Sequence, residues 1–239
     1  MLLKPIGLIY STALFVIPGL LTAVLYTFGF DYVQTFGFSP SNAFMLMAVA
    51  SFLMLFIQFA VLYTAEGNTW SLSALALRLR FRRMSGWQWF WTFIVFLVVT
   101  GSYLGVFASG IVQAIAEHFE LPGWYSAVPL EVEGAYWLIG ARLGLLVLNV
   151  MSEEMLWRGF ILPRQEITHG RWAAPIHGVQ WTLYHIMKPW ELLMLLPGCL
   201  AYAFLATWSK NIMPGIIVHF VFNGLGVILL TLAVFGLIS

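Results

Sequence analysis

Long, uninterrupted apolar runs limit most strongly how this chain can fold. Ile6–Phe30, Ala43–Ala65 and Ile212–Leu237 each contain more than 20 residues and no Asp, Glu, Lys or Arg. A helix needs about 20 apolar residues to cross the hydrocarbon core of a bilayer. The alternation of apolar and polar residues that is typical of a membrane β-barrel is absent from the sequence. The sequence therefore predicts an all-α, polytopic transmembrane helical bundle.

Composition supports a membrane protein and excludes several other classes. The chain is 61% hydrophobic and 9% charged, whereas soluble domains are about 45–50% apolar and about 25% charged. We therefore treat residues 1–239 as one integral membrane domain. The formal net charge of +1 argues against nucleic-acid binding, which needs a basic face. The single cysteine, Cys199, excludes an intramolecular disulfide and a cysteine metal cluster.

We expect about seven spans, or eight if the short fifth span is split or re-entrant. The first apolar run is longer than the ~7–15-residue core of a cleavable signal, so we expect it to be a retained span. Pro163 is expected to end or kink the fourth span. The expected spans are Ile6–Phe30, Ala43–Ala65, Trp87–Ile115, Tyr136–Leu162, Trp172–Met187, Leu192–Trp208 and Ile212–Leu237.

The distribution of basic residues predicts the orientation of the bundle. Seven spans place most of the basic residues on one side and the acidic segment Glu117–Glu133 on the other, with Lys188 as an exception. By the positive-inside rule, the N-terminus is then cytoplasmic. We interpret Arg78–Arg83 as a loop that sets topology, and recognition of anionic lipid head groups is the alternative. The basic residues on the cytoplasmic side are Lys4, Arg78–Arg83, Arg164–Arg171 and Lys210.

A cluster of charges near the end of the fourth span is the main candidate for function. Glu153, Glu154 and Arg158 lie close together in a chain with few charges. One charged residue at membrane depth costs at least ~2.5 kcal/mol on insertion scales. The cluster can be a helix end that carries a structural ion pair, or a catalytic carboxylate held by its neighbours.

Helical spacing separates the roles of the two glutamates. Residues four apart share a helix face, so Glu154 is expected to pair with Arg158 in the favourable acid-first order. Glu153 has the apolar Trp157 at the same spacing and therefore lacks a local partner. A carboxyl group without a counter-ion in an apolar site is suited to act as a general acid or base. We assign the chemistry to Glu153 and a supporting role to Glu154 and Arg158.

Two other spans carry polar residues at the same spacing. In the fifth span, His177, Trp181 and His185 follow one another at intervals of four and are expected to share one helix face. His177 is expected to be interfacial, His185 to be buried with a partner, and Trp181 to form a wall of the site, with a weak role in substrate binding. A hydrogen bond between helices is the alternative role for each histidine.

His219 and Asn223 form the third element, because they share a face of the apolar seventh span. They can clasp two helices together, or they can donate hydrogen bonds to an oxyanion. A carboxylate, two histidines and an asparagine are sufficient to activate water and stabilise a tetrahedral intermediate. The combination indicates hydrolysis of an amide or an ester.

These residues resemble the three motifs of the CPBP family, which includes CAAX prenyl endoproteases and bacterial bacteriocin-processing and immunity proteins. The resemblance covers residues 145–226 and rests on Glu153-Glu154-xxx-Arg158, Trp181-xxx-His185 and His219-xxx-Asn223. It implies a glutamate-dependent intramembrane endopeptidase with a cavity open toward the cytoplasm. By this resemblance, Glu153 activates water with the aid of His185, and His219 and Asn223 stabilise the oxyanion. Trp181 departs from the phenylalanine that is more frequent in the family.

The resemblance also implies the partners and leaves alternatives open. The expected partners are a membrane-associated peptide or protein substrate and the lipid bilayer. The short chain favours a bacterial member, in the inner membrane. No cofactor is expected, and the alternative is a zinc ion bound by Glu153, His185 and His219. A non-catalytic scaffold or immunity protein is the second class. A transporter is less favoured, because the first half of the chain has no matching polar cluster.

Overall fold

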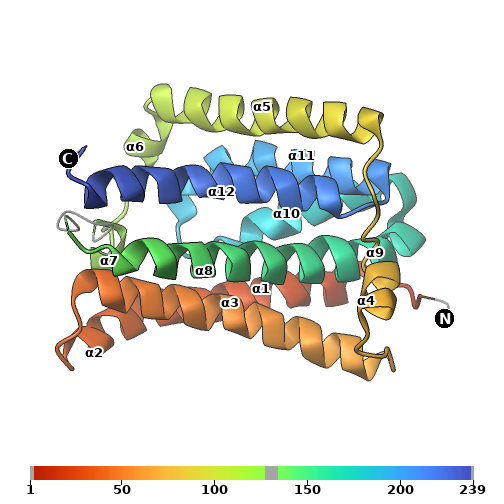
Figure 1. Cartoon of the computed structure of the whole chain (residues 1–239), viewed down its shortest axis with the longest axis horizontal. Helices are drawn as coiled ribbons and strands as arrows, with labels where there is room; N and C mark the ends of the chain where they lie inside the picture. The colour runs from red at the N-terminus through yellow and green to blue at the C-terminus, as the bar shows by residue number, and fades with distance from the viewer. Residues whose placement is uncertain (1–2, 127–133, 238–239) are drawn as a thin grey trace.

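The computed structural model describes residues 3–126 and 134–237 and is a bundle of helices that lie side by side (Figure 1). No strand occurs within these residues, which confirms the predicted all-α fold. The α-helices are α1 (Leu8–Val24), α2 (Phe30–Gln34), α3 (Pro40–Ala65), α4 (Leu72–Arg78), α5 (Gly86–Ala108), α6 (Ile111–Ala116), α7 (Gly123–Ser126), α8 (Trp137–Glu153), α9 (Leu162–His169), α10 (Ala173–Tyr184), α11 (Leu192–Ser209) and α12 (Met213–Val234).

Short helices of other types complete the chain. A π-helix, η1 (Leu25–Gly29), joins α1 to α2, and a second one, η2 (Glu154–Ile161), joins α8 to α9. Two 3-10 turns, η3 (Gly170–Trp172) and η4 (Pro189–Glu191), precede α10 and α11. Both π-helices lie within long continuous helical runs, where they rotate the following turns relative to an ideal α-helix.

Five helical runs are long and apolar enough to cross a membrane, namely Leu8–Gln34, Pro40–Ala65, Gly86–Ala108, Pro189–Ser209 and Met213–Val234. They indicate an integral membrane protein. The fourth and fifth predicted spans also form helices, α8 with its continuation and α10. The α8 run carries charged residues and α10 has 12 residues, so neither has the composition and length of an ordinary span. These two runs carry the polar motifs.

Two predicted spans are shorter than expected. The third ends at Ala108, because Gly110 adopts a left-handed conformation with φ of 74° and begins the separate short helix α6. The fifth ends at Tyr184, because the backbone leaves the helical conformation at His185. The chain therefore turns within the bundle before it enters α11.

Pro163 was predicted to end or kink the fourth span. It does not end the span, because the helical run continues to His169. Proline lacks the N–H that would bond the carbonyl four residues earlier, which is that of Gly159. The Arg78 side chain from α4 replaces this donor, with Nη1 3.2 Å from the Gly159 oxygen. The π-helix η2 lies immediately before Pro163. A cation from another element therefore allows the proline in a continuous helix.

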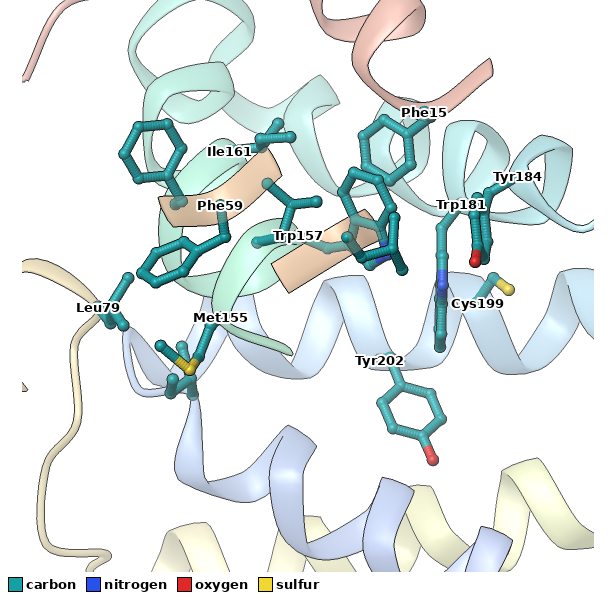
Figure 2. Packing of buried hydrophobic residues seen from close by; sticks show 14 of the residues in the cluster. Phe15, Phe59, Leu79, Met155, Trp157, Ile161, Trp181, Tyr184, Cys199 and Tyr202 are labelled. Atoms are coloured by element: carbon teal, nitrogen blue, oxygen red, sulfur yellow. The ribbon is translucent and has the colours of Figure 1, made fainter. Parts of the chain in front are cut away.

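A hydrophobic cluster around Trp157 fills the centre of the bundle. Phe15 of α1 stacks on Trp157 with ring centroids 4.1 Å apart. Figure 2 shows Trp181, Tyr184 and Cys199 gathered at one edge of this cluster, with Tyr202 below them. Because these residues also contact the polar residues of the second half, the core directly supports the candidate site.

A glycine sets the distance between α10 and α11. A Cβ at Gly178 would lie 2.8 Å from the Leu200 Cα, which is closer than real side chains approach a backbone. We expect Gly178→Ala to destabilise the protein by about 1–3 kcal/mol, because two helices must separate. Thermal unfolding in detergent measures the effect. Gly140→Ala in α8 is the matched control, since no atom of residues 3–126 or 134–237 lies within 4 Å of its Cβ position. An equal loss in both variants would contradict the prediction.

Candidate active site

The four residues predicted to be catalytic line one cavity of about 270 Å³. Glu153 comes from the end of α8, His185 follows α10, and His219 and Asn223 lie one turn apart in α12. Trp181 of α10 lines the same cavity. Three segments that are far apart in the sequence therefore place a carboxyl group, two imidazoles and an amide around one space.

Glu153 is held by Trp181, which the sequence predicted to form a wall of the site with a weak role in substrate binding. Glu153 is 3% exposed, and Trp181 Nε1–H donates a hydrogen bond to its Oε2 over 2.8 Å. The expectation that Glu153 lacks a partner holds only within its own helix. The indole fixes one carboxyl oxygen, and the other oxygen accepts no hydrogen bond from any described residue.

Glu154 and Arg158 form the predicted ion pair, with Arg158 Nη1 3.1 Å from Glu154 Oε1. Both side chains are completely buried. The same Glu154 oxygen also receives a hydrogen bond over 2.9 Å from His219 Nδ1, which sequence reasoning did not anticipate. The Arg158 guanidinium lies 3.4 Å above the Trp181 ring, within range of a cation–π interaction. The pair therefore supports both His219 and the indole that holds Glu153.

His185 occupies the first non-helical position after α10. Its Nδ1 lies 3.0 Å from the Trp181 carbonyl oxygen. Because a carbonyl can only accept, Nδ1 carries the proton, and a neutral ring then has an unprotonated Nε2. The expectation that His177, Trp181 and His185 share one helix face fails at His185, because the helix has ended. The turn nevertheless keeps His185 at the cavity.

The two α12 residues differ in how firmly they are held. The His219 Nδ1–H donates to a carboxylate, so Nε2 is the ring nitrogen that remains for a ligand. The ring also contacts Trp181 and Tyr202, with centroids 5.9 and 5.7 Å away. Asn223 makes no hydrogen bond with any residue that the structure describes, so its amide is free to bind a ligand in the cavity.

His177 lies outside the cavity, and the expectation that it is interfacial is wrong. It is fully buried between α1, α9 and α10. Its Nδ1 donates to Gln165 Oε1 over 2.7 Å, and Gln165 Nε2 donates to Gln180 Oε1 over 2.6 Å. This chain of hydrogen bonds clasps the helices together, which is the alternative that the sequence allowed.

Asn149 is a cavity residue that sequence reasoning missed. It lies one turn before Glu153 on the same helix face and lines the same cavity. Its Oδ1 is buried and has no hydrogen-bond partner among the described residues. The spacing of four from Glu153 could have identified it. An amide presents one acceptor and two donors, which suits a peptide backbone.

The cavity reaches toward one end of the bundle. It includes Met187 and Lys188, which follow α10, whereas the basic residues Arg164 and Arg171 precede α10. Figure 1 shows the N-terminus and α4 at one end of the bundle, and α6 and α7 at the other. The cavity therefore extends toward the end opposite the basic segments. This differs from the expectation of a cavity open toward the cytoplasm, because the positive-inside rule places the basic segments on the cytoplasmic side.

The alternative zinc site is not assembled in this structure. Within residues 3–126 and 134–237, no three His, Cys, Asp or Glu side chains are grouped so that they could hold a metal ion. Glu154 uses its Oε1 for Arg158 and His219, and Trp181 occupies one oxygen of Glu153. Each of the three proposed ligands, Glu153, His185 and His219, therefore has one polar atom bonded within the protein.

Comparison with known families gives a match in the second half of the chain. Residues 135–225 match the family described as Type II CAAX prenyl endopeptidase Rce1-like. No curated protein and no solved structure matches the chain significantly. The family match confirms the resemblance predicted from the three motifs, and it covers every candidate catalytic residue. Because this is a protease family, the match supports a peptidase that acts on a peptide or protein.

Proposed function

We propose that the protein, which is similar to the Rce1-like CAAX prenyl endopeptidases over residues 135–225, is a glutamate-dependent intramembrane endopeptidase. The observation that carries the proposal is the convergence of Glu153, His185, His219 and Asn223 on one cavity. Two of these side chains are also held in place, Glu153 by Trp181 and His219 by Glu154. Such pre-organisation is what a catalytic site requires.

In the proposed reaction, water in the cavity gives a proton to Glu153 and adds to the carbonyl carbon of the scissile peptide bond. His185 Nε2 accepts a hydrogen bond from that water and orients it. The oxyanion of the tetrahedral intermediate accepts hydrogen bonds from the Asn223 amide and from Nε2–H of a protonated His219 ring, whose Nδ1–H donates to Glu154. The intermediate then collapses, the C–N bond breaks, and Glu153 returns the proton to the leaving amine.

We propose that this chemistry needs no metal ion. A chelator is therefore expected to leave the cleavage rate unchanged, within about twofold. The measurement uses purified protein with EDTA, followed by dialysis and addition of zinc. Loss of activity with EDTA that added zinc reverses would instead support the alternative site of Glu153, His185 and His219.

We further propose a bacterial inner-membrane protein with a cytoplasmic N-terminus, an orientation that turns the Lys188 end of the cavity to the outside. For this test, the single native thiol, the buried Cys199, is replaced by alanine. In that background, we expect Lys188→Cys to react with a membrane-impermeant maleimide in intact cells, and Arg171→Cys to react only after permeabilisation. The reverse pattern would contradict this orientation.

The proposed activity is tested by comparing membrane proteomes. Cells that express the wild-type protein, His219→Ala or no protein are compared for new peptide termini. We expect a cleavage event that occurs only with the wild type, while His219→Ala accumulates and unfolds normally. A biological effect that survives His219→Ala, with no change of termini, would overturn the proposal in favour of a non-catalytic scaffold.

A further inference from the structure

A second cavity, of about 250 Å³, lies at the end of the bundle that carries the basic segments. The N-terminal segment, α1, the end of α3, α4 and α9 contribute to it. Its charged lining residues are the cations Lys4, Arg78 and Arg164 and one acid, Glu66. The catalytic proposal uses none of these residues.

Glu66 pairs with two of the three cations, Arg78 and Arg164, and its single negative charge balances one of the three positive charges. Arg78 Nε lies 2.9 Å from Glu66 Oε2, and Arg78 Nη2 lies 3.1 Å from Glu66 Oε1. The remaining nitrogen of Arg78 donates to the Gly159 carbonyl. All three side-chain nitrogens of Arg78 therefore have hydrogen-bond partners within the protein, and Arg78 holds Glu66 in place.

Arg164 and Lys4 retain binding capacity. Arg164 Nε donates to the Lys4 carbonyl over 2.9 Å, and its Nη1 lies 3.3 Å from Glu66 Oε1. Its Nη2 makes no hydrogen bond in the described part of the chain. Lys4 is exposed, and its ammonium is paired with no carboxylate of residues 3–126 or 134–237. The Arg164–Lys4 bond therefore holds the backbone of Lys4 beside the guanidinium, and three cations with one acid give the lining of the cavity a net charge of +2.

The remaining walls are suited to a lipid. Leu3, Leu62 and Ala65 are apolar, and Tyr10 is 51% exposed on the outer surface of α1, which is part of an apolar span. The cavity is thus bounded by apolar residues of two spans and lies where the chain leaves them. A phosphate bound there would be at head-group depth, and its glycerol and acyl chains could follow α1 and α3.

We propose that this cavity binds the phosphate group of an anionic phospholipid. Arg164 and Lys4 contact the phosphate oxygens, and Tyr10 and Leu62 contact the glycerol and the first acyl carbons. Guanidinium groups bind phosphate through charge-assisted hydrogen bonds, and basic pockets between transmembrane helices are a recurrent form of lipid site. A free phosphate ester has the same chemistry and is the other possible source of the ligand.

Lipid titration of the full-length protein tests this proposal. Native mass spectrometry of the detergent-solubilised protein is expected to show preferential binding of phosphatidylglycerol over phosphatidylcholine. Lys4→Gln is expected to weaken phosphatidylglycerol binding by about fivefold, without loss of thermal stability, because its side chain has no partner to lose. Arg171→Gln is the matched control, since Arg171 is an exposed cation at the same end and is outside the cavity.

Equal binding of the two lipids, or an equal loss in Lys4→Gln and Arg171→Gln, would overturn the proposal and leave only a diffuse attraction of the basic end. Competition by glycerol 3-phosphate at a concentration equal to that of the lipid would support the phosphate site and assign it to a soluble ester.

Discussion

Glu153→Gln is expected to abolish peptide-bond cleavage, with a loss of about a thousandfold or more. An amide has nearly the same shape as a carboxyl group, and its oxygen can still accept the hydrogen bond from Trp181 Nε1, so the fold is retained. It cannot take a proton from water or return one to the leaving amine. General acid–base catalysis contributes about 10²–10⁴-fold, and in the proposed mechanism one residue performs both transfers.

The measurement uses purified protein in detergent and a peptide that spans the cleavage site found in the membrane proteome. The rate of product formation at saturating peptide is compared for the wild type, Glu153→Gln and Glu117→Gln. Glu117 is an exposed acid after α6, so its variant controls for the loss of one negative charge. Activity of Glu153→Gln within tenfold of the wild type would exclude Glu153 as the proton acceptor.

The parts of the fold that depend on composition and local spacing could be predicted from the sequence. Bilayer thickness determines the length of an apolar run, so the spans were located from runs such as Ala43–Ala65. The Glu154–Arg158 pair depends only on the separation of four residues, and it survives in the π-helix η2. Both features are set within one helix, where no knowledge of packing is needed.

Contacts between helices could not be predicted in the same way. The bond from Trp181 to Glu153 and the bond from His219 to Glu154 depend on how α10 and α12 are rotated against the α8 run. That rotation depends on close contacts such as the one at Gly178 and on the π-helix after Glu153. Periodicity alone therefore predicts Trp181 as a wall of the site and does not reveal its hydrogen bond to Glu153. The continuation of the helix beyond Pro163 similarly required Arg78 from a distant segment.

The largest effect on stability is expected at Arg158, a buried cation that contacts both Glu154 and Trp181. Arg158→Met is expected to destabilise the protein by about 3–5 kcal/mol, because it leaves the fully buried Glu154 carboxylate without its cation. It also removes the cation from the face of Trp181. The melting temperature in detergent and the amount of folded protein in membranes measure this loss.

Replacing Glu154 as well is expected to recover most of the stability that Arg158→Met loses. This result distinguishes the cost of an unpaired buried charge from that of a packing defect. In Arg158→Met with Glu154→Gln, no ion remains to be desolvated, and the Gln oxygen can still accept from His219 Nδ1–H. The double variant is therefore expected to be more stable than Arg158→Met alone, with a coupling of about 1–3 kcal/mol between the two sites. Strict additivity of the two single substitutions would show that Glu154 and Arg158 do not stabilise each other, and Arg158 would then act mainly through its contact with Trp181.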